Sequence, residues 1–368
     1  MSISTLYVDA AVQAHPDVPK FESTLGLRAI VVDDPTAVYQ TVSSAPDPIQ
    51  AAKQVLFLTR NRGAFLKKCP GTKTYTCCGY LILHIGTFCT MDCSYCILQS
   101  YFHPPVLQFF LNQADLRREL HAHFSTQQIS RIGTGEFTDS LIWEYWTDQA
   151  ARLVTEFAAQ RHCVLELKTK TAAIDNLVGL PHNRKTILAW SVNTPDIIRS
   201  QEKGTAALQA RLEAAARMEQ QEYPLAFHFD PMVIYPGCEE AYGRVVEQIF
   251  EHVTPDNVAW ISLGTFRFMP ALKQVIARRF AASTIPYGEF ITGLDGKMRY
   301  FKPLRIALYQ QVAARIKALA PGVLIYYCME DDKVWSDTLG NTPEEKGGLP
   351  HMLDEAAIRV CDLEGQRS

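Results

Sequence analysis

The sequence predicts an α/β protein built around a partial (β/α)6 barrel or an open parallel sheet. Two observations carry this prediction: short apolar runs alternate with helical stretches along residues 76–280, and turn residues separate them. Strands that alternate with helices form parallel sheets, because each helix returns the chain to the edge where the next strand starts. A third observation concerns function, because three closely spaced cysteines follow the first strand of the series.

Six strands and six helices are expected in this barrel. The strands are expected at 80–85, 129–133, 164–168, 186–190, 225–230 and 259–263. The helices are expected at 115–123, 141–159, 171–178, 206–220, 239–252 and 271–280. In such folds the reactive residues gather at the carboxyl ends of the strands, and the cysteines follow the first strand at that end.

Three further segments flank the expected barrel. Residues 1–75 are expected to form a small N-terminal α/β segment. Residues 281–330 predict a C-terminal extension of a β-hairpin, a helix and a strand, with the hairpin turn at Gly293-Leu-Asp-Gly296. Residues 331–368 are polar and are expected to form a loosely attached tail.

Composition limits the class of protein. The chain has 368 residues, of which 47% are hydrophobic and 20% charged, so it can bury a large core. No run is long and apolar enough to span a bilayer and no secretory leader is evident, so we expect a cytoplasmic protein without a membrane partner. The ten cysteines are then expected to be thiols or metal ligands. A net charge of −3 gives no global attraction to nucleic acid, so such a surface must be local.

The string Cys89-Thr-Met-Asp-Cys93-Ser-Tyr-Cys96 has the spacing C-x3-C-x2-C. Thiolates are the ligands that iron–sulfur clusters prefer, and three of them leave one iron of a [4Fe–4S] cluster open to a small molecule. This arrangement is typical of radical S-adenosylmethionine (SAM) enzymes, in which SAM occupies the open iron and the reduced cluster cleaves it to a 5′-deoxyadenosyl radical. Two alternatives are a zinc site, which usually needs four ligands, and three packed thiols.

Further stretches between about Tyr80 and Cys328 carry a resemblance to a known family. In order along the chain they are Cys96-Ile-Leu-Gln99, His182-Asn-Arg-Lys-Thr186, Ser191-Val-Asn193, Gly204-Thr205, Arg211-Leu-Glu-Ala-Ala215, Tyr223-Pro-Leu-Ala-Phe227, Gly237-Cys-Glu-Glu-Ala-Tyr242, Arg267-Phe268 and Lys273-Gln-Val-Ile276. Together they resemble the spore photoproduct lyase family of radical SAM proteins. The resemblance implies a partial barrel, a [4Fe–4S] cluster, SAM and homolytic chemistry, and the founding activity of the family is repair of a thymine dimer in spore DNA.

The resemblance implies SAM-binding roles for four residues. Lys170 matches the family lysine at the SAM carboxylate, and Ser191 matches a serine that contacts SAM. Glu136 ends the string Gly133-Thr-Gly-Glu136, which resembles the element that receives the SAM amino group. Asp139 matches another SAM-contacting position, with serine replaced by aspartate. The residues alone also allow helix capping by Asp139 or Ser191 and simple surface exposure of Lys170.

Two departures from the family pattern bear on the chemistry. Phe137 stands where the family has a cysteine that donates hydrogen to the product radical, and a phenyl ring cannot donate that hydrogen. Ile97 replaces a family tyrosine, whereas the neighbouring tyrosine is retained as Tyr95. We expect Tyr95 to relay a hydrogen atom or to pack against the cluster loop. Cys238 and Cys328 are candidates for the replacement donor, with buried spectator thiols as the alternative.

The expected partners are a one-electron reductant, such as a flavodoxin or ferredoxin, and a damaged or modified nucleic-acid base as substrate. Basic residues contact phosphate and aromatic residues stack on bases, so the hairpin region predicts a nucleic-acid contact, or else an ordinary charged surface. Two other functions remain open: a radical SAM enzyme acting on a peptide or small metabolite, and a non-catalytic iron–sulfur or redox-sensing protein. The basic residues are Lys297, Arg299, Lys302 and Arg305, and no pattern assigns Cys69, Cys77 and Cys78.

Overall fold

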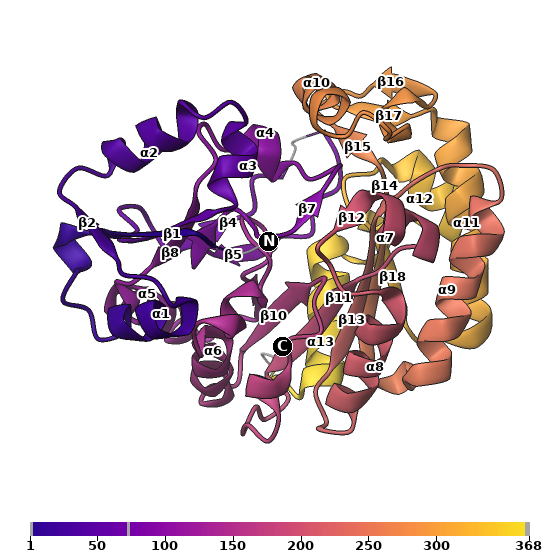
Figure 1. Cartoon of the computed structure of the whole chain (residues 1–368). Helices are drawn as coiled ribbons and strands as arrows, with labels where there is room; N and C mark the ends of the chain where they lie inside the picture. The colour runs from indigo at the N-terminus through magenta and orange to yellow at the C-terminus, as the bar shows by residue number, and fades with distance from the viewer. Residues whose placement is uncertain (1–2, 72–73, 365–368) are drawn as a thin grey trace.

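The computed structural model describes residues 3–71 and 74–364, and its largest sheet is the expected half barrel (Figure 1). The eight strands run in the order β18-β14-β13-β11-β10-β9-β5-β4. All neighbours are parallel except β4 (Leu66–Lys68), which is antiparallel to β5 (Leu81–Leu83). The other strands are β9 (Ser130–Gly133), β10 (Cys163–Thr169), β11 (Thr186–Ser191), β13 (Leu225–Met232), β14 (Val258–Thr265) and β18 (Leu324–Tyr327). The predicted α/β fold is therefore confirmed, and β18 extends its parallel series by one strand.

The helices return the chain between these strands and pack on the outside of the curled sheet. In Figure 1, α8, α9 and α11 form a layer beside β13, β14 and β18. The bounds are α6 (Gln149–Ala158), α7 (Pro195–Gln201), α8 (Leu208–Glu219), α9 (Cys238–His252), α10 (Pro270–Arg279) and α11 (Lys302–Leu319).

One expected helix is shorter and another is absent, and in both stretches polar side chains bind backbone N–H groups. The stretch 141–159 is a 3-10 turn followed by α6, whose first N–H groups donate to Thr147 Oγ1 and Glu144 Oε1. The stretch 171–178 contains only the 3-10 turn Asp175–Leu177. Short side-chain to backbone bonds compete with helix formation in this way.

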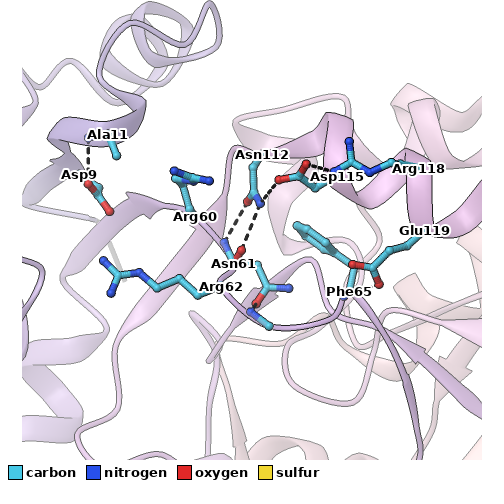
Figure 2. A pocket seen from close by; sticks show the side chains of 11 residues that line it. Asp9, Ala11, Arg60, Asn61, Arg62, Phe65, Asn112, Asp115, Arg118 and Glu119 are labelled. Carbon is cyan, nitrogen blue, oxygen red and sulfur yellow. Dashed lines mark hydrogen bonds and ion pairs between the residues drawn. The ribbon is translucent and has the colours of Figure 1, made fainter.

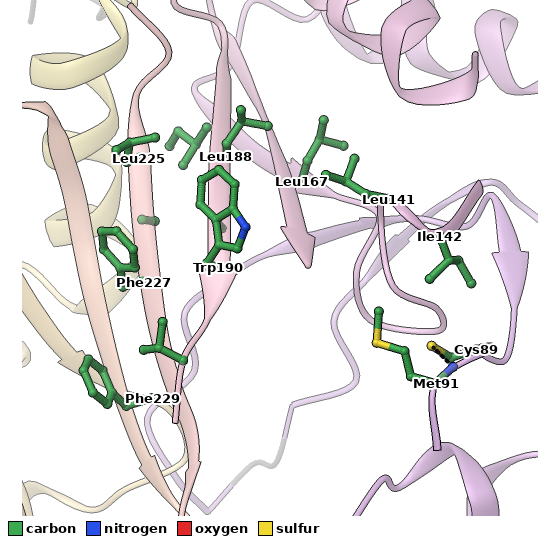
Figure 3. Packing of buried hydrophobic residues seen from close by; sticks show 14 of the residues in the cluster. Cys89, Met91, Leu141, Ile142, Leu167, Leu188, Trp190, Leu225, Phe227 and Phe229 are labelled. Carbon is green, nitrogen blue, oxygen red and sulfur yellow. Dashed lines mark hydrogen bonds between the residues drawn. The ribbon is translucent and has the colours of Figure 1, made fainter. Parts of the chain in front are cut away.

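Alternation along the strands separates an outer apolar face from an inner polar face. Figure 3 shows Leu188 and Trp190 of β11 packed beside Leu225 and Phe227 of β13. Successive residues of a strand point to opposite faces, so Ser191, the residue after Trp190, points into the barrel. The outer face therefore holds the hydrophobic core, and the inner face is free to carry polar groups.

A second sheet precedes the barrel and is interlocked with it. Its order is β2-β1-β3-β8-β6, parallel except between β6 and β8. The strands are β1 (Thr5–Asp9), β2 (Ile30–Val32), β3 (Val55–Thr59), β6 (Gly86–Thr87) and β8 (Leu107–Phe110). Two of these strands come from beyond residue 75, so the expected N-terminal segment shares its sheet with the chain around the cysteines. The segment boundaries remain a prediction.

Helices cover both faces of this second sheet. Figure 1 shows α2 and α3 on one side of it and α1 and α5 on the other. Their bounds are α1 (Val18–Leu25), α2 (Thr36–Ser43), α3 (Pro48–Ala52) and α5 (Gln113–Phe124).

The structure differs from the loosely attached tail expected at 331–368. Residues 332–361 form α12 (Asp332–Leu339) and α13 (Leu349–Cys361), whereas 365–368 lie outside the described residues. Helix α13 contacts β9 on one flank of the curled sheet and β14 and β18 on the other, so it fills the gap between them. Leu353 and Val360 are buried at helical spacing, a pattern that the many polar residues around them obscure.

The predicted hairpin is confirmed. β16 (Phe290–Thr292) pairs antiparallel with β17 (Met298–Tyr300), and β15 (Arg267–Phe268) adds a third strand. Gly296 in the turn has a φ of 75°, which favours glycine. Among the helices in 3–71 and 74–364, none combines the length and the apolar character that a membrane span requires.

Candidate active site

A cavity of about 360 Å³ opens at the carboxyl ends of the barrel strands. The polar residues of its wall come from alternate positions of successive strands, because those positions face inward. Alternation of this kind inside buried strands is the sequence signal by which most of these residues could have been found. They are Glu166, Lys168 and Lys170 from β10 and its end, Ser191 from β11, His228 and Asp230 from β13, Ser262 from β14, and Cys328 after β18.

The three predicted cluster cysteines lie together on one wall of this cavity. Cys89 precedes the short strand β7 (Asp92–Cys93), and Cys96 precedes α4 (Leu98–Tyr101). β7 pairs antiparallel with β12 (Glu202–Lys203), which fixes the middle of the loop against the chain after α7. The cysteine loop is therefore held at the barrel mouth from both sides.

One side chain distant in sequence and one close to the loop bind its carbonyl groups. Lys53 Nζ donates to the Cys89 carbonyl at 3.0 Å and also to that of Met91. Gln99 Nε2 donates to the carbonyls of Cys93 at 3.0 Å and Ser94 at 3.1 Å. Nothing in the spacing of Lys53 pointed to this role, because the contact spans 36 residues. Gln99 belongs to a stretch that already resembled the family.

The donor set fits a [4Fe–4S] cluster better than a single metal ion. In 3–71 and 74–364, no three His, Cys, Asp or Glu side chains converge closely enough to hold one ion. A zinc site requires such convergence, whereas in a cluster each cysteine binds its own iron. The Met91 N–H lies 3.4 Å from Cys89 Sγ, and a hydrogen bond of this kind stabilises a cluster-bound thiolate. Burial raises the pKa of the Cys89 thiol to about 12, so the thiolate needs a bound cation.

Tyr95 is tied to a buried ion pair. Its hydroxyl donates to Glu202, whose other oxygen lies 2.6 Å from Arg211 Nη2. Arg211 Nη1 donates to the Ser191 carbonyl at 2.7 Å, so the end of β11 and the cysteine loop share one support. Arg211 lay in a stretch that resembled the family, but no spacing rule linked it to Tyr95.

Glu136 and Asp139 both line the cavity, with different surroundings. Asp139 accepts hydrogen bonds from Leu141 N at 3.0 Å, Thr169 Oγ1 at 2.8 Å and Lys170 N at 2.8 Å. It thus joins the loops after β9 and β10, and burial raises its pKa. Glu136 makes no hydrogen bond or ion pair with any residue in the described part of the chain. Its carboxylate is therefore free to accept from an ammonium group.

Lys170 carries a positive charge and, like Glu136, has no hydrogen-bonding partner among the described residues. Its ammonium lies 5.8 Å from the centre of the Tyr95 ring and has neither a hydrogen bond nor an ion pair among the residues the structure places. Ser191 lies beside it on the cavity wall. An amino acid carries one ammonium and one carboxylate, and Glu136 and Lys170 offer a partner for each next to the cysteines. The site therefore suits the methionine part of SAM.

A polar network unforeseen from the sequence forms the floor of the cavity. His228 bonds Glu166 Oε1 at 2.8 Å through Nε2 and Ser262 Oγ at 2.7 Å through Nδ1, and Trp260 Nε1 donates to Glu166 at 3.2 Å. Burial favours a higher pKa for Glu166, but the charge of His228 and these hydrogen bonds lower it to about 2. Glu166 is therefore an ionised, fixed acceptor deep in the site.

The side chain of Phe137 does not reach the cavity. It is not one of the described residues lining the cavity, although Glu136 and Thr138 on either side of it are. Its ring stacks on Tyr101 at 5.8 Å between centroids and packs edge-on against His84 at 4.9 Å. The residue at the family's donor position is thus part of an aromatic cluster.

The expectation for Cys238 needs correction. Cys238 is the first residue of α9, is fully buried, and is absent from the cavity lining within the described chain. Helix α9 packs on the outer face of the sheet, which explains why its first residue does not reach the inner face. The cavity instead exposes the thiols of Cys69, Cys78 and Cys328, in addition to the three cluster cysteines.

The basic residues of the hairpin region are already paired. Arg299 lies 2.8 Å from Asp295, which also pairs with Lys297 at 3.3 Å. Lys302 and Arg305 pair with Asp331 and Glu330 in the same way. The tip is apolar instead, because Leu294 is 79% exposed. The hairpin therefore does not present the free positive charge that its sequence suggested.

Comparison with known proteins identifies relatives of this chain. A family model described as spore photoproduct lyase matches residues 70–299. The spore photoproduct lyase of Bacillus subtilis (strain 168) is 25% identical over 254 residues, which cover 66% of this chain and 74% of that protein. The spore photoproduct lyase of Geobacillus sp. (strain Y412MC61) is 24% identical over 210 residues, 56% of this chain and 62% of that protein.

Solved structures show the same fold. A mutant spore photoproduct lyase with bound AdoMet and dinucleoside spore photoproduct superimposes with a TM-score of 0.78 at 20% identity, over 89% of this chain and 99% of the other. A related mutant with the dinucleoside alone gives the same score. Fold and site thus define a radical SAM enzyme, whose cofactors are a [4Fe–4S] cluster and SAM. More precisely within that class, the chain belongs to the spore photoproduct lyase family.

Proposed function

We propose that this enzyme acts on a damaged or modified base in nucleic acid, with Cys89, Cys93 and Cys96 as cluster ligands. The observation that supports SAM-dependent chemistry most directly is the free pair of Glu136 and Lys170 beside the cysteines, whereas the base as substrate is supported by a solved relative that holds a dinucleoside. When bound, the reduced cluster would cleave SAM and supply a radical that abstracts hydrogen from the substrate. The chain's own residues would orient SAM and exclude water.

In this proposal each SAM-binding residue has a defined task. Lys170 holds the SAM carboxylate and Glu136 its amino group through charge-assisted hydrogen bonds. Asp139 acts indirectly, because its oxygens already fix the backbone at Leu141 and Lys170. Ser191 is positioned by Arg211 on the same wall.

The substrate proposal rests on the hairpin tip and on relatedness. The exposed Leu294 resembles the apolar wedges that proteins insert between bases. A solved relative holds a dinucleoside spore photoproduct. Reduced flavodoxin or ferredoxin in the cytoplasm would supply the electron.

Cys328 is the proposed hydrogen donor in place of the family cysteine. It follows the carboxyl end of β18 and lines the same cavity as the cluster cysteines. Burial raises the pKa of its thiol, against the opposing effect of Arg267, so the S–H bond persists at neutral pH. The product C–H bond would form as the S–H bond breaks, and one electron from the reductant together with one proton from solvent would restore the thiol. Tyr95 is the proposed relay beside the cluster.

The first test is anaerobic reconstitution, reduction and chromatographic detection of 5′-deoxyadenosine. Wild type should produce it, and Lys170→Met should bind SAM about tenfold or more weakly while keeping the absorbance of the cluster. Lys203→Met, which alters an exposed lysine of β12, is the matched control. Equal SAM affinity in wild type and Lys170→Met would contradict the assignment of Lys170.

The second test uses ultraviolet-irradiated DNA and analysis of its bases. Loss of a photoproduct with wild type but not with Cys93→Ala supports the nucleic-acid substrate. Cys328→Ala should still cleave SAM with the same substrate yet yield less correctly reduced product. SAM cleavage that no DNA lesion stimulates, but that a peptide or metabolite does, would overturn the substrate proposal.

A further inference from the structure

A second cavity, of about 580 Å³, lies in the N-terminal sheet and has no part in the radical chemistry (Figure 2). It is lined by the carboxyl ends of three neighbouring strands and the loops that follow them, at Asp9 and Ala11 for β1, Arg60–Gly63 for β3, and Asn112 for β8. The three strands are parallel, so the cavity lies at their common carboxyl edge.

The order of strands makes this edge a topological switch point. From β1 the chain crosses to β2 on one side, and from β3 it proceeds to β8 on the other. The loops that leave β1 and β3 therefore diverge and open a crevice between them. In open α/β sheets, ligands bind in such crevices at the carboxyl ends of the strands.

The loop after β3 is fixed before any ligand binds. Asn61 N donates to Asn112 Oδ1 at 2.9 Å, and Asn112 Nδ2 donates back to the Asn61 carbonyl at 3.1 Å. Asn61 Oδ1 also accepts from Gly63 N at 3.2 Å. These bonds hold the two residues that flank Asn61, and Figure 2 shows Arg60 and Arg62 extending from this loop.

The charged side chains of the cavity differ in whether they have a hydrogen-bonding partner. Asp9 accepts from Ala11 N at 2.9 Å and from Thr59 at 3.1 Å. Asp115 pairs with Arg118, and Glu119 accepts two backbone N–H groups, the nearer at 2.8 Å. Every carboxylate of the cavity thus has a hydrogen-bonding partner, although the partners of Asp9 and Glu119 are uncharged.

Arg60 and Arg62 differ from these side chains, because neither makes a hydrogen bond or an ion pair in the part of the chain that the structure places. Two guanidinium groups on a fixed loop offer unused N–H donors to an anion, while the three arginines of the lining balance its three carboxylates in charge. Guanidinium groups match phosphate oxygens in geometry and charge.

We infer that this cavity is a second binding site, independent of the radical site, for a phosphate group held by Arg60 and Arg62. Two sources carry this chemistry: a free nucleotide, which the volume admits, and the backbone of a nucleic acid strand. The inference does not depend on the substrate proposed above.

The test uses the reconstituted holoenzyme with excess SAM, so that the radical site is occupied. Calorimetry with adenosine 5′-monophosphate and fluorescence anisotropy with a labelled, undamaged DNA duplex measure the two sources. Arg60→Ala and Arg62→Ala should each weaken binding of one probe by about tenfold or more. Arg28→Ala, which removes a guanidinium whose side chain is 95% exposed outside the cavity, is the matched control and should bind as wild type.

A loss confined to the nucleotide identifies a free nucleotide, and a loss confined to the duplex, reduced further at high salt, identifies a nucleic acid backbone. Unchanged affinity of both variants for both probes, or an equal loss in Arg28→Ala, overturns the inference. SAM cleavage without DNA should be normal in Arg60→Ala and Arg62→Ala, which separates a failure here from a failure of the proposed function.

Discussion

Arg211 and Glu202 form an ion pair of 2.6 Å, with side chains 0% and 1% exposed, directly beneath the cluster loop. Breaking a buried pair leaves one uncompensated charge and costs about 3–5 kcal/mol. Arg211→Met should therefore lower the free energy of unfolding of the cluster-free protein by that order in urea titrations.

The pair also positions the site, because Glu202 accepts from Tyr95 and Arg211 donates to the Ser191 carbonyl. The double variant Glu202→Gln/Arg211→Met should be more stable than Arg211→Met alone, since no lone charge remains. A double variant as unstable as the sum of both single changes would show that the two residues act separately.

The ionisation of Glu166 should make the free energy of unfolding depend on pH. Its pKa is about 2 in the folded protein and near 4.5 when unperturbed, so the folded state favours the ionised form. The resulting stability, of the order of 3 kcal/mol, is present above pH 4.5 and is lost as the pH falls toward 2. Urea unfolding at pH 6 and pH 3.5 should show the difference between wild type and Glu166→Gln shrinking at the lower pH. A constant difference would contradict this role.

Phe137→Cys introduces the cysteine that the family has at this position, but the new thiol should not donate hydrogen to the product radical. The side chain at this position packs against Tyr101 and His84, outside the cavity lining. Removing the ring should cost about 2 kcal/mol of stability, because its aromatic contacts are lost. Product analysis should show no more correctly reduced product with Phe137→Cys than with wild type. Adding Phe137→Cys to Cys328→Ala should not restore the yield of that product. Rescue there would mean that the position reaches the substrate after all.

Leu294→Asp should weaken binding of irradiated DNA by about tenfold, because a charge cannot replace an apolar wedge between bases. Leu319→Asp places the same change on an exposed leucine at the end of α11 and should bind as wild type. Anisotropy with labelled DNA measures both. Equal affinities would exclude the hairpin tip from the interface.

Regular alternation allowed the barrel to be predicted, because each strand and each long helix carries its own local pattern. The cluster cysteines were predicted from their spacing, whereas the roles of Glu136, Lys170 and Ser191 were expected from the resemblance to the family. Lys53 and Glu202 were not predicted, because their contacts with the cluster loop join residues far apart in the chain. The position of Cys238 was predicted wrongly because several loop residues separate it from the end of β13. Over that length the chain can turn from the inner face of the sheet to the outer face.

The C-terminal helices were missed for a different physical reason. Helix α13 is mostly apolar, but it follows the mainly polar stretch 331–348, and Asp354, Glu355 and Arg359 interrupt its apolar stripe. The hairpin shows the converse, because a sequence rich in Lys and Arg conceals ion pairs with Asp295, Glu330 and Asp331. The charged residues can be counted in the sequence, but which of them form ion pairs is known only from the structure.

The sharing of β6 and β8 between the two halves of the molecule has a consequence for how such an enzyme can be cut or recombined. A fragment that begins near residue 76 would keep β8 but lose β3, its hydrogen-bonded neighbour, and would expose an unpaired edge prone to aggregation. It would also lose Lys53 from the loop that carries Cys89. Swapping the N-terminal half between family members therefore transplants part of the cofactor's scaffold, and a chimaera needs a junction beyond β8.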